Sequence, residues 1–256
     1  RGPKALTVDF PDDLQQRNCV VQVGFRICPG RPVNPLFVED GKNDGRINTL
    51  LIDRNFYRNT SRFDPVAQKI GAVNTLLIED AHIRGYNTDW IGANQALKPI
   101  VDLPASTVLL LGAGGAARAI GFGLQEKGAT VILANRTVAK GQALARDLNC
   151  EFYPLEDIKN LKADALVNAT SVGMTPNVEA TPVTKAFLKN IPAVMDIVYS
   201  PQETRLLREA KQVGCKTVNG TYMLLFQGVA QFELWTGRKA PVDIMREKLF
   251  SKLDLK

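Results

Sequence analysis

Small residues crowd one short stretch of the chain, Gly112-Ala-Gly-Gly-Ala116, directly after an apolar run that ends at Leu111. Gly112, Gly114 and Ala117 fit the spacing G-x-G-x-x-G/A, in which small residues permit a tight turn, close approach of a pyrophosphate and close helix packing. The phosphates of a dinucleotide bind at the amino end of the following helix, whose first N–H groups are free. We therefore expect a dinucleotide to be bound by Gly112, Ala113, Gly114, Gly115 and Ala116.

Two cations follow the next apolar run, at the position where NAD enzymes carry an aspartate or glutamate that holds the ribose hydroxyl. Here the chain reads Asn135-Arg136-Thr137, with Lys140 one turn later, and no carboxylate is present. Arg136 can pair with a 2′-phosphate through its planar guanidinium and lie along the adenine face. The pattern predicts NADP as the cofactor, bound in part by Asn135, Arg136, Thr137 and Lys140. The alternative is an ordinary solvated helix start.

The elements that must position these residues alternate along the chain. Residues 107–111 and 130–134 are apolar runs typical of buried strands, and residues 116–127 carry apolar and small side chains at helical spacing. Further apolar runs follow at 165–168, 194–198 and 216–218, each after a helical stretch. Such βαβ units build parallel sheets with right-handed crossovers, so we expect a doubly wound α/β domain over about residues 100 to 225.

The composition argues against several other classes of protein. The 256 residues are 45% hydrophobic and 23% charged, as in an ordinary globular chain, and no apolar run reaches the length of a membrane span. Four singly placed cysteines and one histidine, His82, argue against a zinc site and against Ser-His or Cys-His catalysis. We expect the cysteines to be reduced, structural thiols.

The net charge of +6 is spread thinly, and lysines and arginines do not cluster with aromatic residues into a nucleic-acid-binding module. An anionic small molecule is a sufficient partner for this charge, and we expect neither a nucleic acid nor a membrane partner. The N-terminal residues lack the apolar stretch of a secretory signal, which favours a cytoplasmic or organelle-matrix location.

Ordered motifs from about residue 64 to the C-terminus resemble those of the shikimate dehydrogenase family. They are Gly71-Ala-Val-Asn-Thr75, Gly85-Tyr-Asn-Thr-Asp-Trp90, Gly112-Ala-Gly-Gly-Ala116, Asn135-Arg-Thr137, Asn168-Ala-Thr-Ser-Val-Gly-Met174, Asp196-Ile-Val-Tyr199 and Gly220-Thr-Tyr-Met-Leu-Leu-Phe-Gln227. The resemblance implies NADP-dependent, reversible reduction of 3-dehydroshikimate to shikimate, a step of aromatic amino-acid biosynthesis, by a monomer or homodimer.

The resemblance also implies a two-domain α/β architecture with the active site in the cleft between the domains. A small substrate domain spans residues 1–98, and C-terminal helices in residues 227–256 return to pack on it. A Rossmann-like, doubly wound NADP-binding domain spans residues 99–226.

Carried over motif by motif, the resemblance assigns a role to individual residues. Asp89 matches the catalytic aspartate, although an aspartate in Asn-Thr-Asp could equally be a turn or capping residue. Asn74, Thr49, Tyr199 and Gln227 match substrate-binding positions, with Gln227 reaching the substrate hydroxyls and Tyr199 lying near its carboxylate. The nicotinamide would be bordered by Thr170, Ser171, Met174 and Met223.

The first 60 residues depart from the family pattern. In an ungapped register with Asn74, the position of the family's catalytic lysine falls on Asp53, and no lysine occurs between Lys42 and Lys69. The family's two serines that bind the substrate carboxylate have no counterpart either. Two alternatives therefore remain: an NADP-binding homologue with weakened or no catalysis that acts as a sensor or partner module, and a quinate/shikimate-type dehydrogenase.

Overall fold

The computed structural model of the chain describes residues 21–26, 63–79 and 82–254. The chain divides into two units, Arg1–Asn87 and Thr88–Lys256. The domain bounds expected from the sequence, 1–98 with 227–256 and 99–226, depend on how the two units associate and stay a prediction.

The described residues of the first unit form a three-stranded antiparallel sheet of order β1-β2-β3 and one helix. The bounds are β1 Val21–Arg26, α2 Pro65–Ile70, β2 Ala72–Glu79 and β3 His82–Tyr86. Asp64 caps α2 by accepting hydrogen bonds from the Val66 and Ala67 N–H groups, and Gly71 ends it with a left-handed backbone. Strand β2 follows at once, and residues 72–77 are buried.

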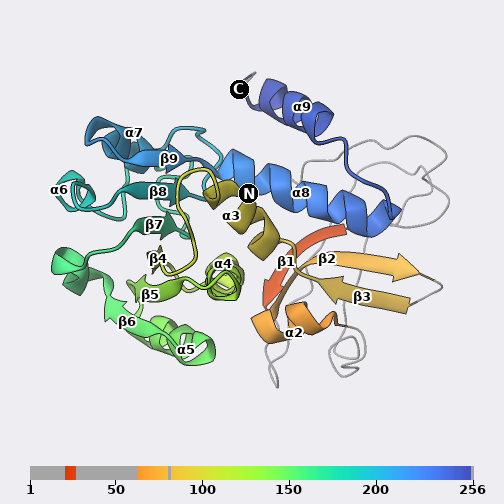
Figure 1. The fold of residues 1–256 in the computed structure, drawn as a ribbon, viewed down its shortest axis with the longest axis horizontal. Coiled ribbons are helices and arrows are strands. Elements are labelled where there is room, and N and C mark those ends of the chain that lie inside the picture. The colour runs from red at the N-terminus through yellow and green to blue at the C-terminus, as the bar shows by residue number, and fades with distance from the viewer. Residues whose placement is uncertain (1–20, 27–62, 80–81, 255–256) are drawn as a thin grey trace. The chain divides into compact units, whose positions relative to one another are not determined.

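The second unit is built on a six-stranded parallel sheet of order β6-β5-β4-β7-β8-β9 (Figure 1). The bounds are β4 Thr107–Leu111, β5 Thr130–Asn135, β6 Glu151–Pro154, β7 Ala165–Asn168, β8 Ala193–Asp196 and β9 Lys216–Val218. The strand order reverses between β4 and β7, the switch point at which doubly wound folds bind dinucleotides.

Helices cover both faces of this sheet, and Figure 1 shows α4 and α6 on opposite sides. The bounds are α3 Asp89–Leu97, α4 Gly115–Glu126, α5 Val138–Leu148, η3 Leu155–Asn160, α6 Lys185–Leu188, α7 Arg205–Gln212, α8 Gly220–Thr236 and α9 Val242–Asp254. Leu110 of β4 lies in one buried core with Ile120 of α4 and Leu144 of α5. The adjacent Leu111 lies in the other core, with Phe187 of α6, because successive side chains of a strand point to opposite faces.

The predicted α/β class is confirmed, and the strands expected at 107–111, 165–168 and 216–218 have those bounds. The expected helix at 116–127 begins one residue earlier, at Gly115. The expected strand at 194–198 runs instead from Ala193 to Asp196. It ends there because the Asp196 side chain accepts the Val198 N–H, which removes that donor from the sheet. In the parts of the chain that are described, no helix combines the length and the apolar character needed to cross a membrane.

Candidate functional site

The glycine-rich turn links the carboxyl end of β4 to the amino end of α4. Gly112 has φ of 116°, and a Cβ placed on it would lie 3.0 Å from the carbonyl oxygen of Ala169, so a larger residue would be strained there. A Cβ on Gly114 or Gly115 would instead meet no atom within 4 Å. Ala117, in the first turn of α4, is fully buried. The turn therefore has the tight bend, the open helix end and the close helix packing that a pyrophosphate site requires.

The next βα turn, after β5, presents the two predicted cations. The Asn135 side chain donates a hydrogen bond of 2.8 Å to the carbonyl of Thr137, which fixes the turn. Arg136, Thr137 and Lys140 are exposed. Within the described residues neither cation forms an ion pair, so both remain available to an anionic group.

A buried polar network joins the carboxyl ends of β7 and β8. Asn168 donates from Nδ2 to Asp196 Oδ1 at 3.0 Å and accepts at Oδ1 from both the Thr170 N–H and the Thr170 hydroxyl. The Thr170 hydroxyl in turn accepts the Val172 N–H at 3.1 Å. These bonds fix the start of the turn that contains Thr170, Ser171 and Met174.

Asp196 accepts two further hydrogen bonds, from the Val198 N–H at 3.1 Å and from the Thr204 hydroxyl at 2.7 Å. Its side chain is fully buried. Burial raises the pKa of Asp196 to about 6, and the hydrogen bonds from Thr204, Val198 and Asn168 act in the opposite direction. The carboxylate is therefore mostly ionised at neutral pH, held by neutral donors.

Helices α3 and α8 cross closely at Gly92. A Cβ on Gly92 would lie 2.7 Å from the carbonyl oxygen of Met223 and 2.9 Å from Cβ of Gln227. The Thr88 hydroxyl donates to Gln227 Oε1 at 3.4 Å, and Thr88 is the N-cap of α3, directly before Asp89. The crossing thus brings the amide of Gln227 to the helix end that carries the predicted catalytic aspartate.

The other predicted site residues differ in exposure. Asn74 lies buried in β2 of the first unit, where its Oδ1 accepts the Thr75 hydroxyl at 2.7 Å. Met174 and Tyr199 are exposed by 39% and 37%, whereas Met223 is buried. Thr49, together with Asp53 and Lys42, lies outside the described residues.

Sequence reasoning missed the roles of Asn168, Asp196, Thr204 and Thr88. Three of them lie in motifs that were recognised: Thr88 lies within Gly85–Trp90, and Asn168 and Asp196 each begin a further motif. Asn168 closes the predicted strand 165–168, and Asp196 lies within the predicted strand 194–198 of the same parallel sheet. The carboxyl ends of such strands meet at one edge, and this signal could have paired the two side chains.

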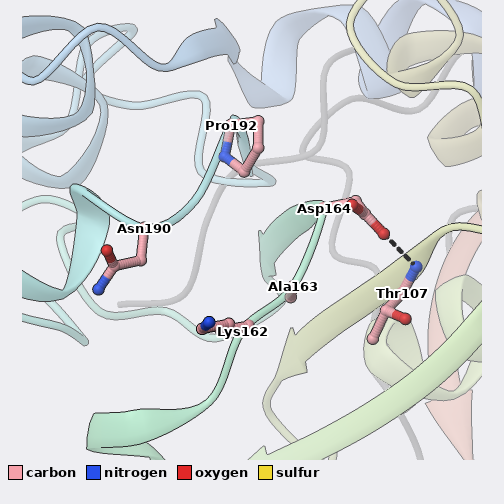
Figure 2. Close-up of a pocket in the computed structure, with 6 residues that line it drawn as sticks. All are labelled: Thr107, Lys162, Ala163, Asp164, Asn190 and Pro192. Atoms are coloured by element: carbon pink, nitrogen blue, oxygen red, sulfur yellow. Dashed lines mark hydrogen bonds between the residues drawn. The ribbon is translucent and has the colours of Figure 1, made fainter.

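A cavity of about 450 Å³ lies at the opposite edge of the sheet. Figure 2 shows its lining residues Thr107, Lys162, Ala163, Asp164, Asn190 and Pro192, which belong to the amino ends of β4, β7 and β8 and the segments before them. Asp164 accepts the Thr107 N–H there at 2.8 Å. Ligands of doubly wound sheets bind at the carboxyl ends of the strands, so this cavity is not assigned to the dinucleotide.

Metal and thiol chemistry find no support in the described part of the chain. No cluster of histidine, cysteine and acidic side chains there could hold a metal ion. Cys150 and Cys215 are free thiols, as expected. Burial and the neighbouring Glu151 raise the pKa of Cys150 to about 11, and burial raises the pKa of Cys215, so neither is an activated nucleophile.

Comparison with known protein families gives two matches. Residues 93–205 match the family described as shikimate / quinate 5-dehydrogenase, and residues 220–250 match the shikimate 5′-dehydrogenase C-terminal domain. The NADP(+)-dependent shikimate dehydrogenase of Methanosarcina barkeri is 45% identical over 203 residues, which are 75% of this chain and 72% of that protein. The enzyme of Methanosarcina mazei is 40% identical over 242 residues, 90% of this chain and 86% of that one.

Solved structures give the same result. A shikimate 5-dehydrogenase of Thermus thermophilus, in complex with NADP(H) and shikimate, matches with a TM-score of 0.68 and 41% identity over 74% of this chain and 71% of that one. A quinate dehydrogenase of Corynebacterium glutamicum, in complex with NAD, matches with a TM-score of 0.67 and 35% identity over 74% of this chain and 71% of that one.

Proposed function

The chain belongs to the shikimate dehydrogenase family, and we propose that it catalyses the NADP-dependent, reversible reduction of 3-dehydroshikimate to shikimate. The observation that carries this proposal is the α3–α8 crossing, which holds the Gln227 amide against the N-cap of the helix that begins with Asp89. An amide beside a carboxylate suits a polyhydroxylated substrate, because it both donates to and accepts from hydroxyl groups.

The residues of the second unit fit NADP. The open amino end of α4 offers free N–H groups to the pyrophosphate, and a Cβ at Gly114 would extend into that space. Arg136 and Lys140 bind the 2′-phosphate of the adenosine ribose, and Asn135 and Thr137 shape the turn that presents them. Thr170, Ser171, Met174 and Met223 border the nicotinamide. When bound, NADPH supplies the hydride that reduces the C3 carbonyl.

The protein side chains bind the substrate and move the proton. Asp89 takes part in proton transfer to the developing alkoxide, which requires direct hydrogen bonding to the reacting oxygen. Gln227 and Asn74 bind substrate hydroxyls through their amides, Thr49 also contacts the substrate, and Tyr199 binds near the carboxylate. Because buried amides are left unpaired by a substrate that lacks the matching hydroxyl, these contacts also select the substrate.

A steady-state assay that follows NADPH formation tests this function. The purified chain is expected to oxidise shikimate with NADP⁺, and Asp89→Asn is expected to abolish turnover while leaving NADPH affinity unchanged. Asp102→Asn, at an exposed aspartate in the loop before β4, is the matched control and should retain turnover.

Each alternative predicts a different result in the same assay. A chain that binds NADPH but turns over neither shikimate nor quinate would be the sensor or partner module. Faster turnover of quinate would identify the quinate/shikimate-type dehydrogenase. A cytoplasmic location and a monomeric or homodimeric state also belong to the proposal and have separate tests, by fractionation and by solution mass measurement.

A further inference from the structure

The hydrogen bonds around Asp196 tie together two loops that leave the same edge of the sheet. The loop after β7 contains Thr170–Met174, and the loop after β8 runs to Thr204 at the N-cap of α7. A second pair of hydrogen bonds also joins the two loops: the Thr175 N–H and hydroxyl both donate to the carbonyl of Ser200, at 3.0 and 3.3 Å. Hydrogen bonds therefore hold the two loops together.

Thr204 joins the loop after β8 to the loop after β7 in two ways. Its hydroxyl donates to Asp196 Oδ2 at 2.7 Å, and its side chain packs beside the turn, because a Cβ placed on Gly173 would lie 3.5 Å from the Thr204 Cβ. The same hydroxyl accepts the Leu207 N–H at 3.4 Å and so caps α7. Thr204 is fully buried.

Burying the Asp196 carboxylate costs folding free energy, so stability alone does not explain the network. A fully buried carboxylate is expensive unless it is paired, and the three donors around Asp196 are all neutral. An apolar group at this position would need no such compensation. What the carboxylate does provide is three acceptor bonds that leave the residues around the turn with a single arrangement.

We propose that Asp196, Asn168 and Thr204 are positioning residues that hold the Thr170–Met174 turn in the conformation that binds the nicotinamide half of NADP(H). This inference rests on the proposed function, since it takes NADP(H) as the cofactor. The three residues act through the turn and do not themselves contact the cofactor. Arg136 and Lys140, proposed to bind the 2′-phosphate at the adenosine end, take no part in these hydrogen bonds.

The test compares two probes, NADP⁺ and 2′,5′-ADP, which carries the 2′-phosphate and lacks the nicotinamide. Thr204→Val removes the hydroxyl and keeps the packing beside Gly173. It is expected to weaken NADP⁺ binding about tenfold, which is ~1.4 kcal/mol, and to leave 2′,5′-ADP binding unchanged. Thr204→Ser, which keeps the hydroxyl, should restore NADP⁺ affinity.

Thr184→Val is the matched control. Thr184 is the N-cap of α6 and accepts the Phe187 N–H at 3.3 Å, so its loss removes a helix cap without touching Asp196. It should change the affinity for neither probe. If Thr204→Val does not fold, Thr204→Ala, a smaller residue that also lacks the hydroxyl, is measured in its place.

The outcomes separate the inference from the proposed function. If Thr204→Val weakened the binding of both probes equally, or of neither, the positioning role would be overturned. The proposal that the chain binds NADP would still stand. An unmodified chain that binds 2′,5′-ADP and NADP⁺ equally would also overturn it, since the turn would then contribute nothing. An unmodified chain that binds neither probe would overturn the proposed function, and the inference with it.

Discussion

Arg136 is exposed directly after β5, at the position where we propose that the chain selects NADP over NAD. Arg136→Asp replaces a charge-assisted hydrogen bond with repulsion of the 2′-phosphate, so the preference for NADPH over NADH should fall by at least about tenfold, or ~1.4 kcal/mol. Fluorescence titration with both nucleotides measures it. Arg146→Asp makes the same charge change in the last turn of α5 and should leave the preference intact. Equal affinities in the unmodified chain would contradict the assignment.

The ionisation of Asp196 makes stability depend on pH. Burial raises its pKa from 3.8 to about 6 in the folded chain, so the folded state holds the proton more tightly than the unfolded state. Its contribution to the free energy of unfolding is therefore largest below pH ~4 and falls by up to ~3 kcal/mol as pH rises past ~6. Relative to Asp196→Asn, the unmodified chain should lose stability across this range in urea titrations. A stability difference that is constant with pH would refute this.

The structural role of a single residue can be predicted from the sequence when that role depends on neighbouring residues in the chain. The positive φ of Gly112 and the open helix end at Gly114 were predictable, because both follow from a strand, a turn and a helix that are consecutive in the chain. The bond between Asn168 and Asp196 was not predicted, since it depends on two strands with matched ends. The Thr88–Gln227 contact joins residues still farther apart in the chain.

At the level of helices and strands, the crossing of α3 and α8 depends on Gly92. Gly92→Ala would place a methyl group 2.7 Å from a backbone oxygen, and no side-chain rotation can relieve that clash. It should destabilise the chain by about 1 to 3 kcal/mol and raise the KM for shikimate, because Gln227 moves with α8. Urea unfolding and steady-state kinetics measure the two effects.

Gly228→Ala is the control for this crossing, since it lies on α8 one residue after Gln227. There a Cβ would make an ordinary contact of 3.8 Å with the Met245 side chain, so the change should be neutral or stabilising by up to ~1 kcal/mol. If Gly92→Ala behaved like Gly228→Ala, the close packing of the two helices would be excluded.

Elements with strong apolar character were predicted most accurately. Strands β4 and β7 have buried runs of aliphatic residues, and their bounds agree with the sequence prediction. Strand β6, Glu151–Pro154, was not predicted: it begins with an exposed glutamate, ends at a proline and lies at the edge of the sheet, so neither an apolar run nor alternation marks it. Parallel pairing with β5 stabilises this segment as a strand, although its own sequence does not indicate one.

For the molecule as a whole, the proposed activity draws on residues from distant segments of the chain. The residues proposed to bind the pyrophosphate and the 2′-phosphate form a local set between Gly112 and Lys140, and this explains why NADP could be predicted from the sequence. Asn74, Asp89 and Gln227 are separated by much of the sequence, and their assignment needed the family resemblance. The family's catalytic lysine would belong with these three residues. Its position falls on Asp53, which lies outside the described residues.

In this register two carboxylates, Asp53 and Asp89, would face the reacting oxygen without a cation. Two adjacent carboxyl groups could still share and donate a proton, but stabilisation of the oxyanion would be lost. Loss of one such group costs ~10² to 10⁴ in rate, so shikimate oxidation should be slow, and Asp53→Lys should raise kcat. Steady-state kinetics with shikimate and NADP⁺ measure this. Fast turnover that is unaffected by Asp53→Ala would show that a lysine elsewhere in the chain reaches the substrate.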